Sequence, residues 1–194
     1  KGIVDFIRML ANIPEINDLA MTTNGIFLSQ YAVPLKQAGL NRINISLDSM
    51  DPEKFKTISR GGELNKVLEG IHAAKLAGFN PIKINCVVIN SSSEKDATEV
   101  REYCEKNNLE VRYIHMMSLS KGTFSVVEGG SGGDCINCSR LRLTANGKLK
   151  PCLFSNIEYD VRQLGASEAI KRAVNNKPEY GSVNNMNQFH NIGA

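Results

Sequence analysis

The sequence predicts an α/β fold in which helices connect the strands of a parallel β-sheet. Four apolar, strand-like segments lie within residues 18–119, and helical segments separate each from the next. This alternation describes successive βαβ units, which build a parallel sheet. Such a sheet stays open as a doubly wound fold or curves into a barrel. In both cases ligands bind at the carboxyl ends of the strands.

Two spacings of apolar residues distinguish the predicted elements. Helices are predicted where apolar residues recur every three or four positions, as Ile3, Ile7 and Leu10 do. Strands are predicted where a short apolar run ends in polar residues. In chain order the predicted elements are helix 2–13, strand 18–25, helix 30–39, strand 42–49, helix 51–60, helix 64–78, strand 82–90, helix 91–108 and strand 111–119.

Local signals mark the ends of several helices. Asp51 is a predicted N-cap, with Pro52 in the first turn behind it. Gly39 and Gly78 are predicted to stop the helices before them. The serines at 91–93 can cap the helix that follows them. Candidate ligand groups stand at the strand ends: Thr22, Thr23, Asn24, Ser46, Asp48, Asn90, Met116 and Met117.

The character of the chain changes near residue 120, where we place a domain boundary. Residues 121–127 (KGTFSVV) are strand-like, and a glycine-rich stretch follows. Asn146 and Gly147 predict a hairpin turn, residues 167–176 predict a helix, and the tail 181–194 is polar and predicted to be irregular. The predicted domains are therefore residues 1–120 and residues 121–194.

Composition limits the classes of protein to which the chain can belong. A net charge of +3 is too small to predict nucleic-acid binding, although it is compatible with a local anion site. No apolar run approaches 18 residues, so no membrane-spanning helix is expected. The 5 cysteines are odd in number and unevenly spaced, which argues against a secreted disulfide framework. We therefore expect a cytoplasmic protein whose thiols are free to bind metal.

Three cysteines form the pattern C-x2-C-x13-C, with Cys135, Cys138 and Cys152 at its positions. Structural zinc normally has four protein ligands, so zinc would need a distant fourth ligand such as His115 or His190. A [4Fe–4S] cluster with one open iron needs only three thiolates. The spacing alone leaves both alternatives open.

Several charged residues and thiols have either a functional or a purely structural interpretation. Arg140 and Arg142 are two apart, so on a strand they face the same side, where they either bind phosphate or a purine edge or are simply solvated. Lys83 opens an apolar strand, which suggests anion binding or a snorkelling side chain. Cys86 and Cys104 are predicted to lie in the core, and His72 on a helix surface.

Five stretches in the same order resemble one enzyme family: MTTNG, RINISLDSMDPEKF, PIKINCVVI, VRYIHMM and CINCSRLRLTANGKLKPCLF. The family is that of the radical S-adenosylmethionine GTP 3′,8-cyclases of molybdenum-cofactor biosynthesis. C-x2-C-x13-C with R-x-R after the second cysteine is its second-cluster signature. The implied fold is a partial parallel (β/α) barrel of the radical SAM type with a small C-terminal iron–sulfur domain.

The resemblance implies a radical reaction. A first [4Fe–4S] cluster splits S-adenosylmethionine into methionine and a 5′-deoxyadenosyl radical, which takes the 3′ hydrogen of GTP. The ribosyl radical attacks guanine C8 and yields (8S)-3′,8-cyclo-7,8-dihydroguanosine 5′-triphosphate, the precursor used by cyclic pyranopterin monophosphate synthase. The second cluster holds guanine through its open iron. Homodimers are common in the family.

The resemblance also implies a role for particular residues. Cys135, Cys138 and Cys152 resemble the second-cluster ligands. Ser46 and Met117 resemble the contacts of S-adenosylmethionine. The residues that resemble GTP contacts are Thr22, Lys83, Arg112, Arg140, Leu141 and Arg142.

Parts of the family pattern are missing from these residues. The C-x3-C-x2-C loop, the GGEP segment and the first barrel strands are expected before Lys1, so we expect a piece of a longer enzyme that is inactive by itself and leaves a sheet edge open. Several tens of further family residues are expected between Ser120 and Lys121. The family tail ends Gly-Gly, against Gly193–Ala194 here, and His115 replaces a family glutamate.

Two alternatives to the cyclase remain at this stage. One is a non-catalytic, nucleotide-binding cluster module, which would bind GTP without cleaving S-adenosylmethionine. The other is a radical SAM enzyme that acts on a peptide, although such enzymes arrange their C-terminal cysteines differently.

Overall fold

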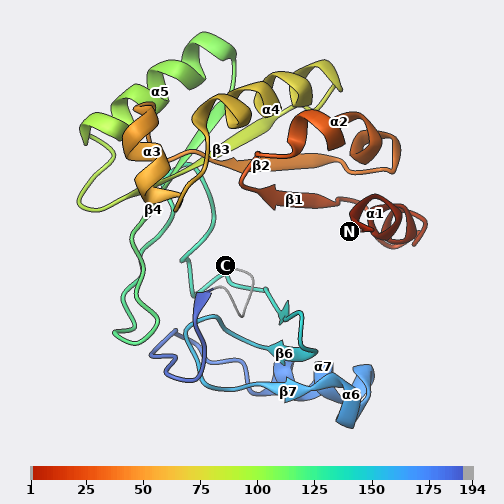
Figure 1. The fold of residues 1–194 in the computed structure, drawn as a ribbon. Coiled ribbons are helices and arrows are strands. Elements are labelled where there is room, and N and C mark those ends of the chain that lie inside the picture. The colour runs from red at the N-terminus through yellow and green to blue at the C-terminus, as the bar shows by residue number, and fades with distance from the viewer. Residues whose placement is uncertain (1, 190–194) are drawn as a thin grey trace. The chain divides into compact units, whose positions relative to one another are not determined.

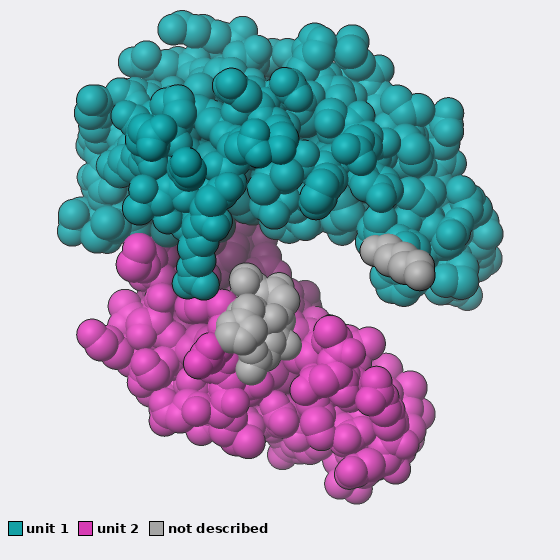
Figure 2. Space-filling model, viewed as in Figure 1, with its two compact units in different colours: residues 1–114 teal, residues 115–194 magenta. Residues whose placement is uncertain are grey.

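The computed structural model describes residues 2–189, and the chain divides into two compact units (Figures 1 and 2). Unit 1 is Lys1–Ile114 and unit 2 is His115–Ala194. Within the described residues, no helix is both long enough and apolar enough to cross a membrane. The functional division at residue 120 stays a prediction, since compactness does not test what each part does.

Unit 1 is built on a four-stranded sheet in the order β1-β2-β3-β4, with β1–β2 and β2–β3 parallel. The strands are β1 (Ala20–Thr23), β2 (Arg42–Ser46), β3 (Ile82–Val88) and β4 (Glu110–His115). The helices are α1 (Ile3–Ala11), α2 (Leu28–Gln37), α3 (Pro52–Ile58), α4 (Leu64–Leu76) and α5 (Lys95–Asn107). The predicted α/β fold with a parallel sheet is confirmed.

The two faces of this sheet differ in polarity. Helices α2, α4 and α5 lie side by side on one side of it (Figure 1). The core on this side includes Ile45 of β2, Ile84 of β3 and Val67 of α4, all fully buried. Alternation along each strand therefore turns the residues between the core positions, such as Asn44 and Lys83, to the opposite face.

Local chemistry sets most helix ends as predicted. The Asp51 carboxylate accepts a hydrogen bond of 2.9 Å from the Lys54 amide, which caps α3. Gly39 and Gly78 adopt positive φ directly after α2 and α4. The predicted serine cap of α5 is wrong. Instead, the Glu94 carboxylate accepts from the amides of residues 89–91, and these bonds lower its pKa.

The described sheet is partial and does not close into a barrel. Strand β1 pairs with β2 and has no second partner among residues 2–189. This matches the open edge expected from the sequence.

Unit 2 contains a three-stranded antiparallel sheet, β5-β6-β7, against which helices pack. Its elements are β5 (Arg142–Leu143), β6 (Lys148–Lys150), β7 (Tyr159–Asp160), α6 (Val161–Leu164) and α7 (Ala166–Asn175). The predicted hairpin is confirmed, with Gly147 at φ +84 in the turn and Leu143 opposite Leu149. The predicted helix near the C-terminus is confirmed as α7.

Two small apolar clusters hold unit 2 together. Leu149 of β6 packs with Ala169 and Ala173 of α7. Leu119 and Phe154 form the second cluster, in which the Phe124 and Phe154 rings stack at a centroid distance of 4.3 Å. The first cluster fixes α7 on the hairpin, and the second supports the loop that carries Cys152.

The strand predicted at residues 121–127 is wrong. Residues 118–123 form a tight turn instead, in which Ser118 and Thr123 exchange both backbone hydrogen bonds, at 2.9 and 3.0 Å. Gly122, at φ +65, allows this reversal. The strand predicted at 111–119 likewise ends early, at His115, before the turn that begins at Ser118. Residues 177–188 form no helix or strand, and the end of the tail lies outside the described residues.

Candidate functional site

The exposed face of the unit 1 sheet carries a row of polar side chains. Thr22, Asn44 and Lys83 are aligned across β1, β2 and β3 by the strand register. The Asn44 amide donates to the Thr22 hydroxyl at 3.3 Å. Asn44 was missed in the sequence, although the alternation in RINIS could have placed it beside the predicted contact Thr22.

The cations on this face differ in how they are paired. Lys83 Nζ lies 2.6 Å from Glu110 Oε2, and its side chain is only 17% exposed. Arg112 Nε is buried and has no hydrogen-bond partner among the described residues, and the same holds for Asn44 Oδ1. A buried donor without a partner costs free energy unless an acceptor satisfies it. One donor and one acceptor of these residues are therefore unsatisfied in the described structure.

The two predicted contacts of S-adenosylmethionine lie in different units. Ser46 ends β2 and is in register with Asn85 of β3. Beyond it, burial raises the pKa of Asp48, although a 2.7 Å hydrogen bond from the Val87 amide partly offsets this effect. Met117 belongs to unit 2, where it packs against the apolar cluster around Phe154.

A surface pocket of about 400 Å³ in unit 1 is lined by residues between Ile3 and Leu35. Thr23 and Asn24, both at the predicted strand end, line it together with Phe27 and Tyr31. Neither Lys83 nor any arginine contributes to its wall. The pocket is therefore distinct from the polar row.

The three cysteines of the motif are free and partly exposed. A turn joins the first two, since the Cys138 amide donates to the Cys135 carbonyl at 3.2 Å. Asp134 supports this turn by accepting from the Asn137 side chain at 2.9 Å. Cys152 packs against the cluster around Phe154. Each motif thiol is therefore accessible from solvent while its backbone is held.

The surroundings shift the pKa values of Cys138 and Cys152 in opposite directions. Partial burial raises the pKa of Cys138, but the Arg140 amide and the Lys177 ammonium outweigh it, so the net pKa is lowered. Burial raises the pKa of Cys152, and the Phe154 amide and Lys177 only partly compensate. Both thiols thus lie within the field of Lys177, which the sequence did not single out.

The three motif thiols do not form a gathered metal-binding group in the described residues. Among residues 2–189, no three His, Cys, Asp or Glu side chains lie close enough together to hold one metal ion. The charges of Cys135 and Cys138 do raise the pKa of the Cys152 thiol. A [4Fe–4S] cluster with one open iron needs three thiolate ligands. The fit is thus one of donor chemistry, three thiols beside cationic groups.

Of the two histidines proposed as a fourth zinc ligand, only His115 lies among the described residues, and it forms no metal-binding group with the motif cysteines. His115 Nε2 lies 2.9 Å from Glu128 Oε1. His190 lies outside the described residues. His72 is exposed on α4, as predicted.

The two arginines between the cysteines have different surroundings. Arg140 is exposed and donates to the Ser131 hydroxyl at 3.0 Å. Arg142 is more deeply placed: burial, followed by the charge of Arg140, lowers its pKa, whereas Cys152 and Cys138 raise it. Leu141 packs against the cluster around Leu149. The role of this R-x-R segment in nucleotide binding stays a prediction.

Comparison with known proteins identifies the family. The family described as Radical SAM superfamily matches residues 1–104, and that described as Molybdenum Cofactor Synthesis C matches residues 87–183. GTP 3′,8-cyclase of Alkaliphilus oremlandii is 34% identical over 227 residues, covering 92% of this chain and 71% of that protein. The chain belongs to the GTP 3′,8-cyclase family. The predicted resemblance is confirmed.

Other cyclases of this family show the same level of similarity. The protein of Petrotoga mobilis is 34% identical over 230 residues, covering 92% of this chain and 71% of its own length. That of Listeria monocytogenes is 33% identical over 229 residues, covering 91% and 69%. Each of these matched spans exceeds the 194 residues of this chain. The relatives therefore contain internal residues that this cyclase-family chain lacks, and their expected position between Ser120 and Lys121 stays a prediction.

In the cluster-free cyclase-family chain, we expect iodoacetamide to alkylate Cys138 faster than Cys86 or Cys104. Burial raises the pKa of Cys86 and Cys104 to about 12, so neither is a thiolate near neutral pH. The pKa of Cys138 is lowered and that of Cys152 is raised, so at about pH 7 a larger fraction of Cys138 is already thiolate. Raising the pH from about 7 to about 9 therefore accelerates the alkylation of Cys138 less than that of Cys152. Peptide mapping by mass spectrometry measures these rates. Equal rates at Cys138 and Cys104 would contradict this assignment.

Proposed function

We propose that the chain takes part in the conversion of GTP to (8S)-3′,8-cyclo-7,8-dihydroguanosine 5′-triphosphate. The proposal rests on one observation above all: the motif Cys135, Cys138 and Cys152, with R-x-R inside it, lies in a chain of the cyclase family. GTP and S-adenosylmethionine are the proposed substrates. No residue of this chain is assigned to radical formation.

The C-terminal unit is proposed to recognise the guanine end of GTP. A [4Fe–4S] cluster bound to the three thiolates would supply an open iron that a guanine nitrogen or oxygen can ligate. The residues themselves supply charge and orientation. Arg140 and Arg142 are planar, permanently charged donors suited to a purine edge or a phosphate. The backbone of Leu141 is held between them by its packed side chain.

The polar row of unit 1 is proposed to contact the ribose and phosphates of GTP through Thr22, Lys83 and Arg112. The unsatisfied Arg112 Nε supports this, because a phosphate oxygen would satisfy it. Lys83 would have to exchange or share its partner Glu110. Ser46 and Met117 are proposed contacts of S-adenosylmethionine. Within this scheme, residues 1–120 form the barrel part and residues 121–194 the cluster and nucleotide part.

The wider setting is also proposed from the family. The product would pass to cyclic pyranopterin monophosphate synthase, and the chain would act in the cytoplasm, where thiols stay reduced. A homodimer is the proposed assembly.

The direct test is nucleotide binding by the chain after anaerobic incubation with iron and sulfide. We expect iron and sulfide to be retained and GTP to bind more tightly than ATP, which separates guanine recognition from general phosphate binding. Equilibrium dialysis gives both affinities. Retention of iron with no GTP binding would overturn the nucleotide role, and failure to retain iron would overturn the cluster role.

Replacing either arginine is expected to weaken GTP binding. A charge-assisted hydrogen bond is typically worth about 1–3 kcal/mol, so Arg140→Ala and Arg142→Ala should each weaken GTP by that order. Arg162→Ala is the matched control, since Arg162 is exposed on α6 of the same unit. Equilibrium dialysis against GTP measures the three affinities. Equal affinity in all three variants and the parent chain would show that the guanidinium groups are merely solvated.

A further inference from the structure

Lys177 connects the two ends of the segment between Cys138 and Cys152. Its Nζ donates to the Arg140 carbonyl at 2.8 Å and to the Pro151 carbonyl at 2.6 Å. Arg140 follows the second cysteine of the motif closely, and Pro151 directly precedes the third. One ammonium group thus ties together the two backbone segments that flank the β5–β6 hairpin.

The position of Lys177 is set by helix α7. Ala169 and Ala173 bury one face of α7 against Leu149 of the hairpin. Beyond the helix end, the Lys177 amide donates to the Val174 carbonyl at 3.2 Å, and Pro178 cannot continue the helix. Packing and this terminal turn therefore fix the origin of the side chain.

The contacts of Lys177 are not those of an ordinary lysine at a helix end. Such a lysine usually reaches water or the last carbonyls of its own helix. Both carbonyls bonded by Lys177 Nζ instead belong to the cysteine segment, 37 and 26 residues away along the chain. The side chain therefore serves the cysteine segment rather than α7.

A lysine ammonium has three N–H donors. Two are used by the Arg140 and Pro151 carbonyls. These two bonds hold the positive charge of Lys177 beside the segments that carry Cys138 and Cys152.

We infer that Lys177 is a positioning residue of the three-cysteine site, which ties together the segments that carry Cys138 and Cys152 and places a positive charge beside them. This inference rests on the proposed cluster role of these cysteines. Two consequences follow for a bound cluster. It is retained longer, because the ligand segments are tied together. Its reduction potential is higher, because a positive charge beside the cluster favours the more negative, reduced state.

The test compares Lys177→Met, Lys177→Arg and Lys171→Met in the 194-residue chain, loaded anaerobically with iron and sulfide. Lys171 is an exposed lysine of α7 and controls for loss of charge on the same helix. Three quantities are measured: the rate at which a chelator removes iron, the midpoint potential from a dithionite titration followed by EPR, and the melting temperature. The first two report on the cluster, and the third reports on the fold.

Lys177→Met is expected to lose iron to the chelator about 10-fold faster than the parent chain, in line with other residues that support metal ligands. Its midpoint potential is expected to fall. Lys177→Arg keeps the charge and should recover most of both properties, and Lys171→Met should match the parent. If Lys177→Met retains too little cluster for a titration, the chelator rate and the rescue by arginine still decide the question.

The outcomes separate this inference from the proposed function. A parent chain that retains no iron–sulfur cluster would overturn the proposed function. A parent chain with a cluster, and a Lys177→Met variant with the same chelator rate and potential, would overturn the inference alone. A lower melting temperature with an unchanged potential would also overturn it, since Lys177 would then support only the fold.

Discussion

Cys138→Ser is expected to remove the iron–sulfur cluster and guanine binding from unit 2. A serine hydroxyl is a far weaker iron ligand than a thiolate, and the motif supplies only three thiols, so none can replace the lost one. Cys138 is also the motif thiol whose pKa the surroundings lower, which favours its thiolate form. Iron and sulfide content, the absorbance of the cluster and GTP affinity measure the loss.

The matched control for this substitution is Cys104→Ser. Cys104 is 1% exposed within the core of unit 1, and burial raises the pKa of its thiol to about 12. Its replacement should cost stability but leave the iron content unchanged. Equal iron loss in the two variants would show that Cys138 is not a ligand.

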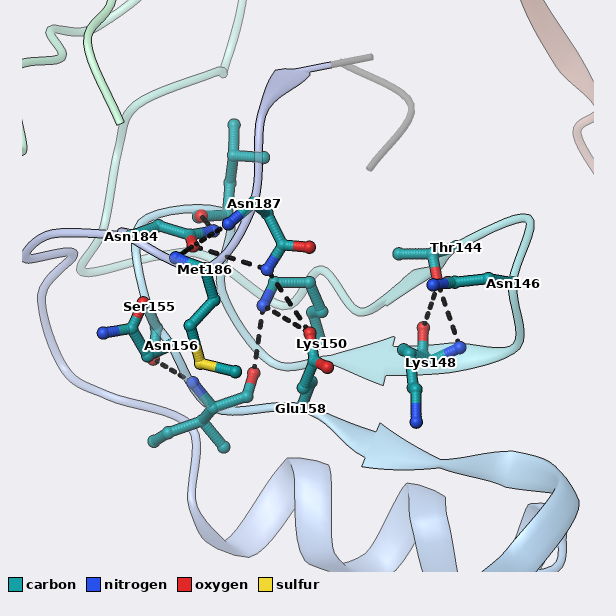
Figure 3. Close-up of polar contacts among 12 residues, drawn as sticks. Thr144, Asn146, Lys148, Lys150, Ser155, Asn156, Glu158, Asn184, Met186 and Asn187 are labelled. Atoms are coloured by element: carbon teal, nitrogen blue, oxygen red, sulfur yellow. Dashed lines mark hydrogen bonds and ion pairs between the residues drawn. The ribbon is translucent and has the colours of Figure 1, made fainter. Parts of the chain in front are cut away.

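The second large effect is expected at a buried ion pair in unit 2 (Figure 3). Lys150 is 0% exposed, and its ammonium lies 3.4 Å from Glu158 Oε2 and 3.4 Å from the Ile157 carbonyl. Glu158→Gln removes the compensating charge while keeping the shape. Because an uncompensated buried charge typically costs about 3–5 kcal/mol, we expect a loss of stability at the lower end of that range, since Ile157 remains as a partner.

A neighbouring pair, whose lysine lies on the same strand as Lys150, provides the control. Lys148 lies 2.8 Å from Asp160, and because Lys148 is 30% exposed, Lys148→Met should cost less stability than Glu158→Gln. Thermal and urea unfolding of the chain measure both variants. Adding Lys150→Met to Glu158→Gln should recover part of the lost stability, because no buried charge then remains. A Glu158→Gln variant as stable as Lys148→Met would contradict the importance of burial here.

The elements that the sequence predicted correctly depend on neighbouring residues. The cap at Asp51, the stop at Gly78 and the hairpin turn at Gly147 each act within a few positions of the chain. The strand at 121–127 was wrong because Ser118 and Thr123 close a turn there in place of an extended strand. A contact with a distant residue also holds this turn, since the Asn184 amide donates to the Leu119 carbonyl at 2.8 Å.

The candidate site shows the same division. The cysteine motif is a local spacing and was recognisable, as were the polar strand ends. The pairing of Lys83 with Glu110 and the contacts of Lys177 join residues far apart in the sequence. No periodicity or spacing in the sequence predicts these contacts, so they become visible only in the folded structure. Strand β7 and helix α6 were missed because both are too short to show a period.

The turn at residues 118–123 has an inner and an outer side. On the inner side Gly122 is pressed against the Ser182 carbonyl, so that even a Cβ atom would clash there. On the outer side Ser120 and Lys121 are both exposed. Segments of variable length are tolerated where they leave the surface without disturbing bonded backbone. An insertion between Ser120 and Lys121 would therefore project outward as a separate loop and leave the contact between Gly122 and Ser182 in place.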